Sequence, residues 1–432
     1  MQEIESNILD TLKLDTALRL AKQKSNEGSS IEARNIYKDI LYKFPKNKKA
    51  IEGIKALLGN TIGKASYVQD PPQDSLQILI NLYEQGQLEQ ALNQATSLLR
   101  KFPNSVMLYN ICGIAYQGLG QLDAAISNFK QAIFIKPGYA DTYSNMGLAL
   151  QEKNKPEEAI ESYKKALAIK PDYAEAFSNM GNAFQDLGKL EKSIEAYKKA
   201  LDIKPDNADA HYNLGNALQD QGKLEEAIEA YKKASSLKPN YADTYSNMGV
   251  ALKEKKNLEE AIEAFKKALA IKPDYAPAYH NMGSVLNDQG KTGEALVAYK
   301  KALAIKPDYA ESYNNMGCVL DGQGKPREAL AAYKKALAIK PDYAEAYNNM
   351  GTVLNDQGKP GEALAAYKQA LAIKPNYAEA YYNMGTVLNG LGKPEEALSA
   401  YKKALEINPD FSKASAGMGE CLLKIGKFEE GR

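Results

Sequence analysis

The stretch AYNNMGTVLNDQGKP, residues 346–360, decides how this chain folds, because nearly the same letters return along the sequence at a fixed interval. Close copies are TYSNMGLALQEKNKP at 142–156 and AYYNMGTVLNGLGKP at 380–394. Prolines keep the same interval of 34 residues from Pro103 through to position 409. A fixed period of this length predicts a stacked array of short helical repeats, not a single globular core.

We number the positions of each repeat from 1 to 34, with Ala140 at position 1 of one repeat. Apolar residues at positions 4, 7, 8 and 11, and again at 17, 20, 21, 24, 27 and 28, follow helical spacing and predict two amphipathic helices per repeat. Gly222, Gly290 and Gly358 at position 15 can adopt a positive φ and end the first helix. Pro326 at position 17 suits the first turn of the second helix, where a backbone N–H is not needed.

This pattern resembles the tetratricopeptide repeat (TPR), a helix-turn-helix family whose repeat is also 34 residues long. The resemblance rests on Gly at position 8, Ala at position 20 and Pro at position 32. At position 4, where the family frequently has Trp, most repeats of this chain have Tyr, which fills a similar volume. The resemblance implies an all-α fold, a right-handed superhelical solenoid of TPR helix-turn-helix hairpins.

The resemblance covers residues 72–411 as ten TPR repeats of 34 residues. Residues 1–58 are predicted to form a divergent N-terminal helical segment with one TPR-like repeat, whose last helix ends near Leu58, and residues 59–71 to form a linker. Residues 412–432 are predicted to form a partial eleventh repeat. We expect this last repeat to leave Cys421, Leu422 and Ile425 uncovered, because no further helix follows in the sequence.

Position 6 is Asn in eight successive repeats, and in a stacked array these amides form a ladder along the concave groove. The ladder consists of Asn145, Asn179, Asn213, Asn247, Asn281, Asn315, Asn349 and Asn383. An amide offers two donors and an acceptor to an extended peptide backbone without selecting its sequence. The ladder is similar to that of the TPR arm of O-linked N-acetylglucosamine transferase, which implies peptide binding. The alternative is that these amides bridge neighbouring repeats.

Other groove positions are expected to tune this binding. Position 5 varies and includes Tyr212, His280, Asn314 and Tyr382, which we expect to give local specificity. Positions 2 and 13 are acidic in most repeats, so the groove is predicted to prefer extended, neutral-to-basic protein or peptide segments. The acids may equally be solvated charges near helix ends, which is the open alternative. Lys413 is the only basic residue at positions 2, 5 or 6 from Ala140 onward, so we do not expect acidic C-terminal tails of chaperones as partners.

Composition excludes several classes of function. Lys and Arg total 55 and Asp and Glu total 54, so the net charge of +1 predicts neither nucleic acid nor an anionic membrane as a partner. Three widely spaced cysteines and two histidines form no metal-ligand motif, so we predict no metal site and no cofactor. The N-terminus has no signal-peptide pattern, and no apolar run is long enough to cross a membrane. The expected location is cytoplasmic.

No sequence motif of a catalytic site is present, so we predict no catalytic residues and no enzyme activity for these 432 residues. The sequence therefore predicts a protein–protein interaction scaffold that binds extended peptide or protein segments in its concave groove. The alternative is an N-terminal substrate-recognition arm of a larger enzyme, such as a glycosyltransferase, sulfotransferase or oxygenase, whose catalytic part would follow residue 432.

Overall fold

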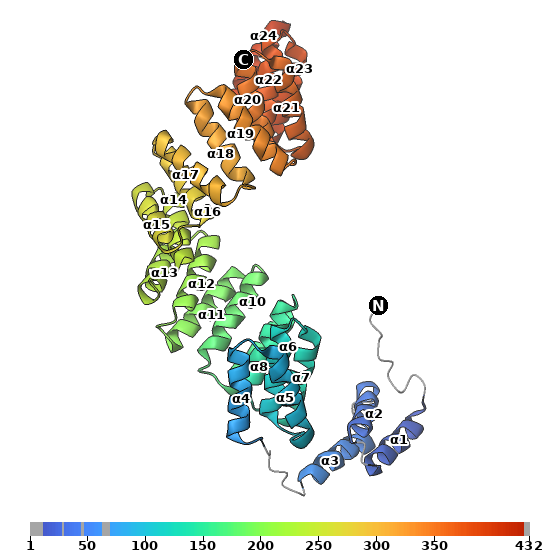
Figure 1. Ribbon diagram of the computed structural model, residues 1–432. Coiled ribbons are helices and arrows are strands. Elements are labelled where there is room, and N and C mark those ends of the chain that lie inside the picture. Colours follow the sequence, from blue (N-terminus) through green and yellow to red (C-terminus); the bar gives the residue numbers. More distant parts are fainter. Residues whose placement is uncertain (1–11, 28–29, 45–46, 63–69, 427–432) are drawn as a thin grey trace. The chain divides into compact units, whose positions relative to one another are not determined.

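A computed structural model describes residues 12–27, 30–44, 47–62 and 70–426. In this part of the chain all regular secondary structure is helical (Figure 1). Contacts within the chain divide it into two compact units, Met1–Pro171 and Asp172–Arg432, which we call unit 1 and unit 2 and describe separately. The predicted fold class, an all-α solenoid of helix-turn-helix hairpins, is confirmed.

Unit 1 begins with three helices that pack on one another and continues with three hairpins. Its helices are α1 (Leu14–Asn26), α2 (Ser30–Lys43), α3 (Lys48–Ile62), α4 (Gln73–Glu84), α5 (Leu88–Lys101), α6 (Val106–Gly118), α7 (Leu122–Ile135), α8 (Ala140–Glu152) and α9 (Pro156–Ile169). From α4 onward each even-numbered helix is the first helix of a hairpin and the following odd-numbered helix is the second.

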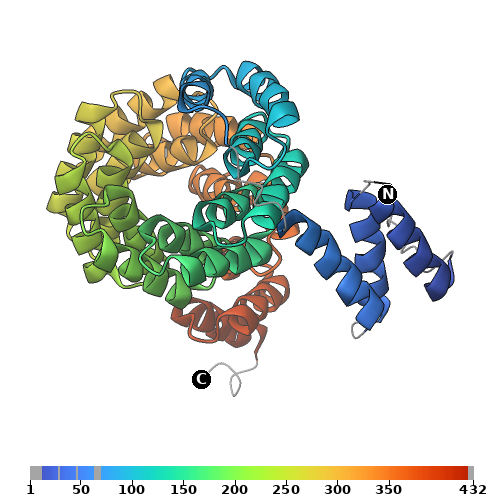
Figure 2. The same cartoon turned by 90° about the horizontal axis from the view of Figure 1, so that it is seen from below.

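Unit 2 continues the same alternation. Its helices are α10 (Ala174–Asp186), α11 (Leu190–Ile203), α12 (Ala208–Asp220), α13 (Leu224–Leu237), α14 (Ala242–Glu254), α15 (Leu258–Ile271), α16 (Ala276–Asp288), α17 (Thr292–Ile305), α18 (Ala310–Gly322), α19 (Pro326–Ile339), α20 (Ala344–Asp356), α21 (Pro360–Ile373), α22 (Ala378–Gly390), α23 (Pro394–Ile407) and α24 (Ser412–Ile425). Figure 2 shows these hairpins, coloured green to red, following one another along a curve.

Each hairpin closes around an aromatic ring at position 24 that lies against the glycine at position 8. In the α12–α13 hairpin the ring of Tyr231 is fully buried, and a Cβ atom added to Gly215 would lie 2.6 Å from its Cε1 atom. Such a distance is shorter than any normal carbon contact, so only glycine lets the two helices approach this closely. The same contact is made by Phe265 and Gly249 in the next hairpin.

The turn inside each hairpin uses the predicted left-handed residue at position 15. Gly222, Gly290 and Gly358 have φ angles of 78°, 76° and 71°. In two hairpins a residue with a side chain takes this conformation instead: Asn154 with φ 59° and Lys256 with φ 67°. The positions that end the first helix were therefore predicted correctly, including those where the sequence departs from glycine.

The hairpins of unit 2 stack through a shared apolar core. One buried cluster runs from Ile194 on α11 to Val319 on α18, and it joins each second helix to the first helix of the next hairpin. No hairpin can bury its apolar faces alone, so the stack depends on contacts between neighbours.

The two irregular ends differ from the expectation. Helix α3 continues to Ile62, four residues past its predicted end, and residues 63–69 of the predicted linker lie outside the described part of the chain. At the other end, Cys421 and Leu422 are 0% and 3% exposed, so the prediction that they are uncovered was wrong. They pack against α22 and α23, and the exposed apolar residue of α24 is Leu423.

Candidate functional site

The first helices of unit 2 line the inner face of the stack. Each first helix contacts the first helix of the next hairpin, as α12 contacts α14 and α14 contacts α16. Between residues 172 and 426, successive second helices make no contact with one another. Elements on the inside of a curved stack lie closer together than those on the outside, so the first helices form the concave face.

The predicted amide ladder lies on this face. All eight position-6 asparagines are half-buried. Asn145 belongs to α8 in unit 1, and the other seven belong to consecutive first helices from α10 to α22 in unit 2. Helical spacing thus brings one amide per hairpin to the same face, with part of its surface open to solvent.

Several of these amides also bridge neighbouring hairpins. The Nδ2 atom of Asn213 donates a hydrogen bond to Oδ1 of Asn182 on the preceding first helix, at 3.0 Å. Asn247 makes the equivalent bond to Asn216 at 3.0 Å and a second one to the hydroxyl of Tyr212 at 3.1 Å. The alternative that the amides have a structural role is therefore real for these members of the ladder.

The C-terminal hairpins use a variant of the same bridge. Asn349 donates to Oδ1 of Asn314 at 3.1 Å and also lies 3.4 Å from the Cys318 sulfur. Asn383 donates to Oδ1 of Asn348 at 3.0 Å. In each case the acceptor is at position 5 or position 9 of the preceding repeat, so one residue type at position 6 serves every junction that offers an acceptor.

Position 9 also accepts the hydroxyl of the position-24 tyrosine in its own hairpin. The Tyr231 hydroxyl donates to Oδ1 of Asn216 at 2.8 Å, and that of Tyr197 donates to Asn182 at 2.5 Å. The same oxygen thus receives a tyrosine hydroxyl from behind and an asparagine amide from the next hairpin. This three-residue relay was missed in the sequence analysis, although its residue types recur at fixed positions.

Three predicted specificity residues at position 5 pack in one way. Tyr212 lies between Tyr231 and Tyr241, with ring centroids 6.1 and 4.9 Å away. Tyr382 takes the same place between Tyr401 and Phe411, at 5.9 and 5.1 Å. Each is half-buried, so part of the ring faces the groove and part supports the hairpin.

His280 is the third of these rings, packed against Tyr309 and Tyr299 with centroids 4.8 and 5.7 Å away. Its Nδ1 atom lies 2.8 Å from the hydroxyl oxygen of Ser312. Burial lowers the pKa of His280 to about 4, although the charge of Glu311 acts in the opposite direction. The ring is therefore neutral near pH 7 and contributes shape and one hydrogen bond, not charge.

Asn314 does not fit the predicted role. It is 6% exposed, because its side chain lies in the junction with the next hairpin, where it accepts the bond from Asn349. Position 5 of this repeat is thus covered, and Asn314 has no surface from which to select a peptide. We correct its assignment from groove residue to bridging residue.

The acids at position 2 are largely neutralised, which changes the predicted charge of the groove. Glu345 lies 2.9 Å from the ammonium of Lys374, at position 31 of the same repeat. Equivalent pairs join Asp209 to Lys238 at 3.3 Å and Glu311 to Lys340 at 3.5 Å. These acids carry little net charge toward a ligand.

The acids at position 13 keep their charge. Glu152, Asp220 and Glu254 are exposed, and each accepts a hydrogen bond from a glutamine on the preceding first helix, at 2.7, 3.2 and 3.2 Å. A glutamine leaves the carboxylate ionised. The negative charge of the concave face therefore comes from position 13.

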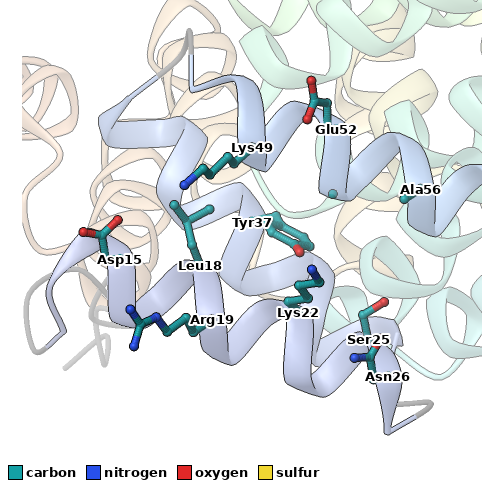
Figure 3. Close-up of a pocket in the computed structure, with 11 residues that line it drawn as sticks. Asp15, Leu18, Arg19, Lys22, Ser25, Asn26, Tyr37, Lys49, Glu52 and Ala56 are labelled. Atoms are coloured by element: carbon teal, nitrogen blue, oxygen red, sulfur yellow. The ribbon is translucent and has the colours of Figure 1, made fainter.

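A separate pocket of about 750 Å³ lies among α1, α2 and α3 (Figure 3). Arg19 and Lys22 from α1 and Lys49 from α3 contribute positive charge, and Asp15 and Glu52 contribute negative charge. Tyr37 from α2 lies between the two outer helices and is 5% exposed. The mixed, exposed charges define no single ligand, and the sequence analysis did not predict this pocket.

Nothing in the described ranges groups three or more potential metal ligands. Nor is any helix there both long and apolar enough to cross a membrane. Cys112 and Cys421 are buried, whereas Cys318 is exposed and half of its repeat's relay. Burial is the main cause that raises the pKa of the Cys318 thiol, so this sulfur is not an activated nucleophile.

Comparison with known families agrees with the repeat. A model described as TPR repeat matches residues 113–154, 149–188, 181–222 and 215–256. Models described as tetratricopeptide repeat match residues 240–308, 274–342 and 342–410, and also 79–105. Together these matches cover well over half of the sequence. The chain belongs to the tetratricopeptide repeat family, and its repeats form a scaffold of the kind that binds other proteins.

No curated protein sequence matches the chain. Among solved structures, MamA is 32% identical, with 38% of this chain and 97% of MamA covered and a TM-score of 0.37. YrrB, whose structure is titled as a TPR protein with an unusual peptide-binding site, is 29% identical, with 43% and 96% covered and a TM-score of 0.36. Yeast Tom70 is 15% identical, with 83% and 89% covered and a TM-score of 0.45.

Proposed function

We propose that the chain holds extended protein or peptide segments against the concave face of unit 2. The observation that carries this proposal is the row of seven half-buried amides from Asn179 to Asn383, one on each successive first helix. At the bridging rungs Nδ2 is occupied, and among the described residues the Oδ1 atoms of Asn213, Asn247 and Asn383 have no hydrogen-bond donor. These oxygens can accept backbone N–H groups, which every peptide except proline supplies.

The charge of the face supports a neutral-to-basic partner. Position 13 supplies exposed carboxylates such as Asp220 and Glu254, whereas the position-2 acids are paired with lysines. A basic side chain projecting from a bound segment would meet uncompensated negative charge along one edge of the ladder. A recognition arm of a larger enzyme would use the same face, so the proposal holds for either biological role. The three unpaired cysteines suit a reducing compartment such as the cytoplasm.

An array of random-sequence peptides probed with the purified chain tests this proposal. The groove variant replaces Asn213, Asn247, Asn281 and Asn315 with Ala, and the control variant replaces four exposed lysines of the second helices, Lys232, Lys266, Lys300 and Lys334, with Ala. We expect the groove variant to lose binding by at least about tenfold, because several hydrogen bonds worth roughly 0.5–1.5 kcal/mol each are removed. The control variant should bind as the wild type does.

Circular dichroism of each variant separates binding from folding. Equal binding by a folded groove variant and the wild type would contradict the proposal. If the groove variant unfolds because its bridges are lost, the single substitution Asn281→Ala replaces it, since that side chain bridges no hairpins.

A further inference from the structure

The amide ladder contains two kinds of rung, and the residues of the preceding hairpin decide which kind each one is. At the α12–α14 junction the preceding hairpin supplies Asn216 at position 9 and Tyr231 at position 24, and Asn247 is held by them. At the α14–α16 junction position 9 is Val250 and position 24 is Phe265. This hairpin offers neither an amide oxygen nor a tyrosine hydroxyl to Asn281.

Asn281 consequently has no hydrogen-bond partner anywhere in the described part of the chain, although it is half-buried like the other rungs. The neighbouring polar groups are engaged elsewhere: His280 with Ser312, and Lys253 with Ser284 at 2.7 Å. The same combination occurs once in unit 1, where Ile114 and Phe129 precede Asn145. Asn145 also has no hydrogen-bond partner among the residues that the structure describes. The two instances are independent and follow one rule.

The chemistry of the two kinds of rung differs. A bridging amide has its Nδ2 atom engaged, so toward the groove it acts mainly as an acceptor. A free amide offers two donors and an acceptor in one plane, which matches the C=O and N–H groups of a peptide backbone. Leaving such a group half-buried without a protein partner costs free energy unless water or a ligand satisfies it.

We propose that Asn281 is the anchor of the groove, pairing with both the C=O and the N–H of a bound extended segment, whereas the bridging rungs accept single N–H bonds. The inference deepens the proposed function and rests on it. It assigns the strongest backbone contact of unit 2 to the α14–α16 junction. It also assigns the control of that contact to Val250 and Phe265, which do not touch the ligand themselves.

The test uses a fluorescein-labelled peptide of repeating Ala-Ser-Lys-Ser, long enough to span α14 to α18, and measures its affinity by fluorescence anisotropy. Asn281→Ala should weaken binding by about tenfold and leave the melting temperature unchanged, since roughly two hydrogen bonds to the peptide and none to the protein are lost. Asn247→Ala should do the reverse, with a lower melting temperature and a change in affinity of less than about threefold.

A second pair of variants exchanges the two kinds of rung without touching either asparagine. Val250→Asn combined with Phe265→Tyr copies the residues that hold Asn247, so it should engage Asn281, raise the melting temperature and weaken peptide binding several-fold. Asn216→Val combined with Tyr231→Phe copies the residues that leave Asn281 free, and it should strengthen binding at Asn247.

The outcomes distinguish the inference from the proposed function. If the wild type does not bind the peptide at any concentration, the proposed function fails for this probe and the inference fails with it. If the wild type binds but Asn281→Ala and Asn247→Ala weaken binding equally, or if engaging Asn281 leaves affinity unchanged, the inference alone is overturned.

Discussion

At the scale of single residues, the most informative feature is the coupling of positions 9 and 24. Tyrosine at position 24 accompanies a polar residue at position 9, as in Tyr231 with Asn216, whereas Phe265 accompanies Val250. Both residues are visible in the sequence, so the pairing could have been predicted from it. What the sequence could not show is that position 6 of the next repeat reaches the same atoms, because that depends on how closely two hairpins stack.

One hairpin departs from this coupling and shows what the hydroxyl requires. Tyr163 follows Leu148 at position 9, and its hydroxyl lies 3.3 Å from Oε1 of Gln151 instead. A buried tyrosine hydroxyl needs some acceptor, and the glutamine at position 12 is the nearest substitute. The ladder itself was predicted from the sequence, but the division of its amides into bridging and free ones was not.

The contact between glycine and aromatic ring gives a prediction at this scale. Gly215→Ala should lower the free energy of unfolding by about 1–3 kcal/mol, because the added methyl group would overlap the buried ring of Tyr231. Chemical denaturation followed by circular dichroism measures the change. The control is Gly390→Ala, where a Cβ atom meets nothing within 4 Å and the change should stay within about 0.5 kcal/mol. Equal effects of the two substitutions would disprove the packing argument.

At the scale of helices and turns, the sequence predicted most boundaries because each has a chemical mark. Position 15 ends the first helix through a left-handed residue, and proline at position 17 begins the second in hairpins such as α19 and α21. The boundary of α3 had no such mark. Gly59 suggested a break, yet the helix continues through it to Ile62, since a single interior glycine costs only about 1 kcal/mol.

The two turns without glycine lead to a prediction at this scale. Lys256 holds a φ angle of 67°, which costs a residue with a Cβ atom about 1–2 kcal/mol. Lys256→Gly should therefore raise the free energy of unfolding by about 1 kcal/mol, as measured by the denaturation midpoint. Gly290→Ala, at the same position of the next repeat, should lower it by a similar amount. A stabilising Gly290→Ala substitution would show that the turn carries no strain.

At the scale of the whole molecule, composition predicted a nearly neutral chain but not where the charge lies. The sequence analysis counted the acids of positions 2 and 13 together as groove charge. The structure pairs Glu345 with Lys374, a residue 29 positions later that returns to it at the end of the hairpin. Such a pair follows from the path of the chain between helices, so periodicity alone could not reveal it.

A prediction at this scale concerns the interchangeability of repeats. Deleting residues 342–375 should give a folded protein, because Asn314 then stands where Asn348 stood and can accept the amide of Asn383. We expect unchanged helicity per residue and a smaller denaturant m-value, since less surface is exposed on unfolding. Deleting residues 325–358 keeps the same period but joins the chain inside two turns, and it serves as a second version. Aggregation or loss of helicity in both variants would contradict this expectation.

The valine and phenylalanine that precede Asn281 have a consequence for how such a gene evolves. Recombination between near-identical coding segments adds or removes whole repeats, and most such events lengthen the protein without adding a free amide. Only an event that copies the segment encoding Val250 and Phe265 adds another one. The length of the array and its number of strong attachment points are therefore inherited separately, and selection can change valency while the reach of the scaffold stays the same.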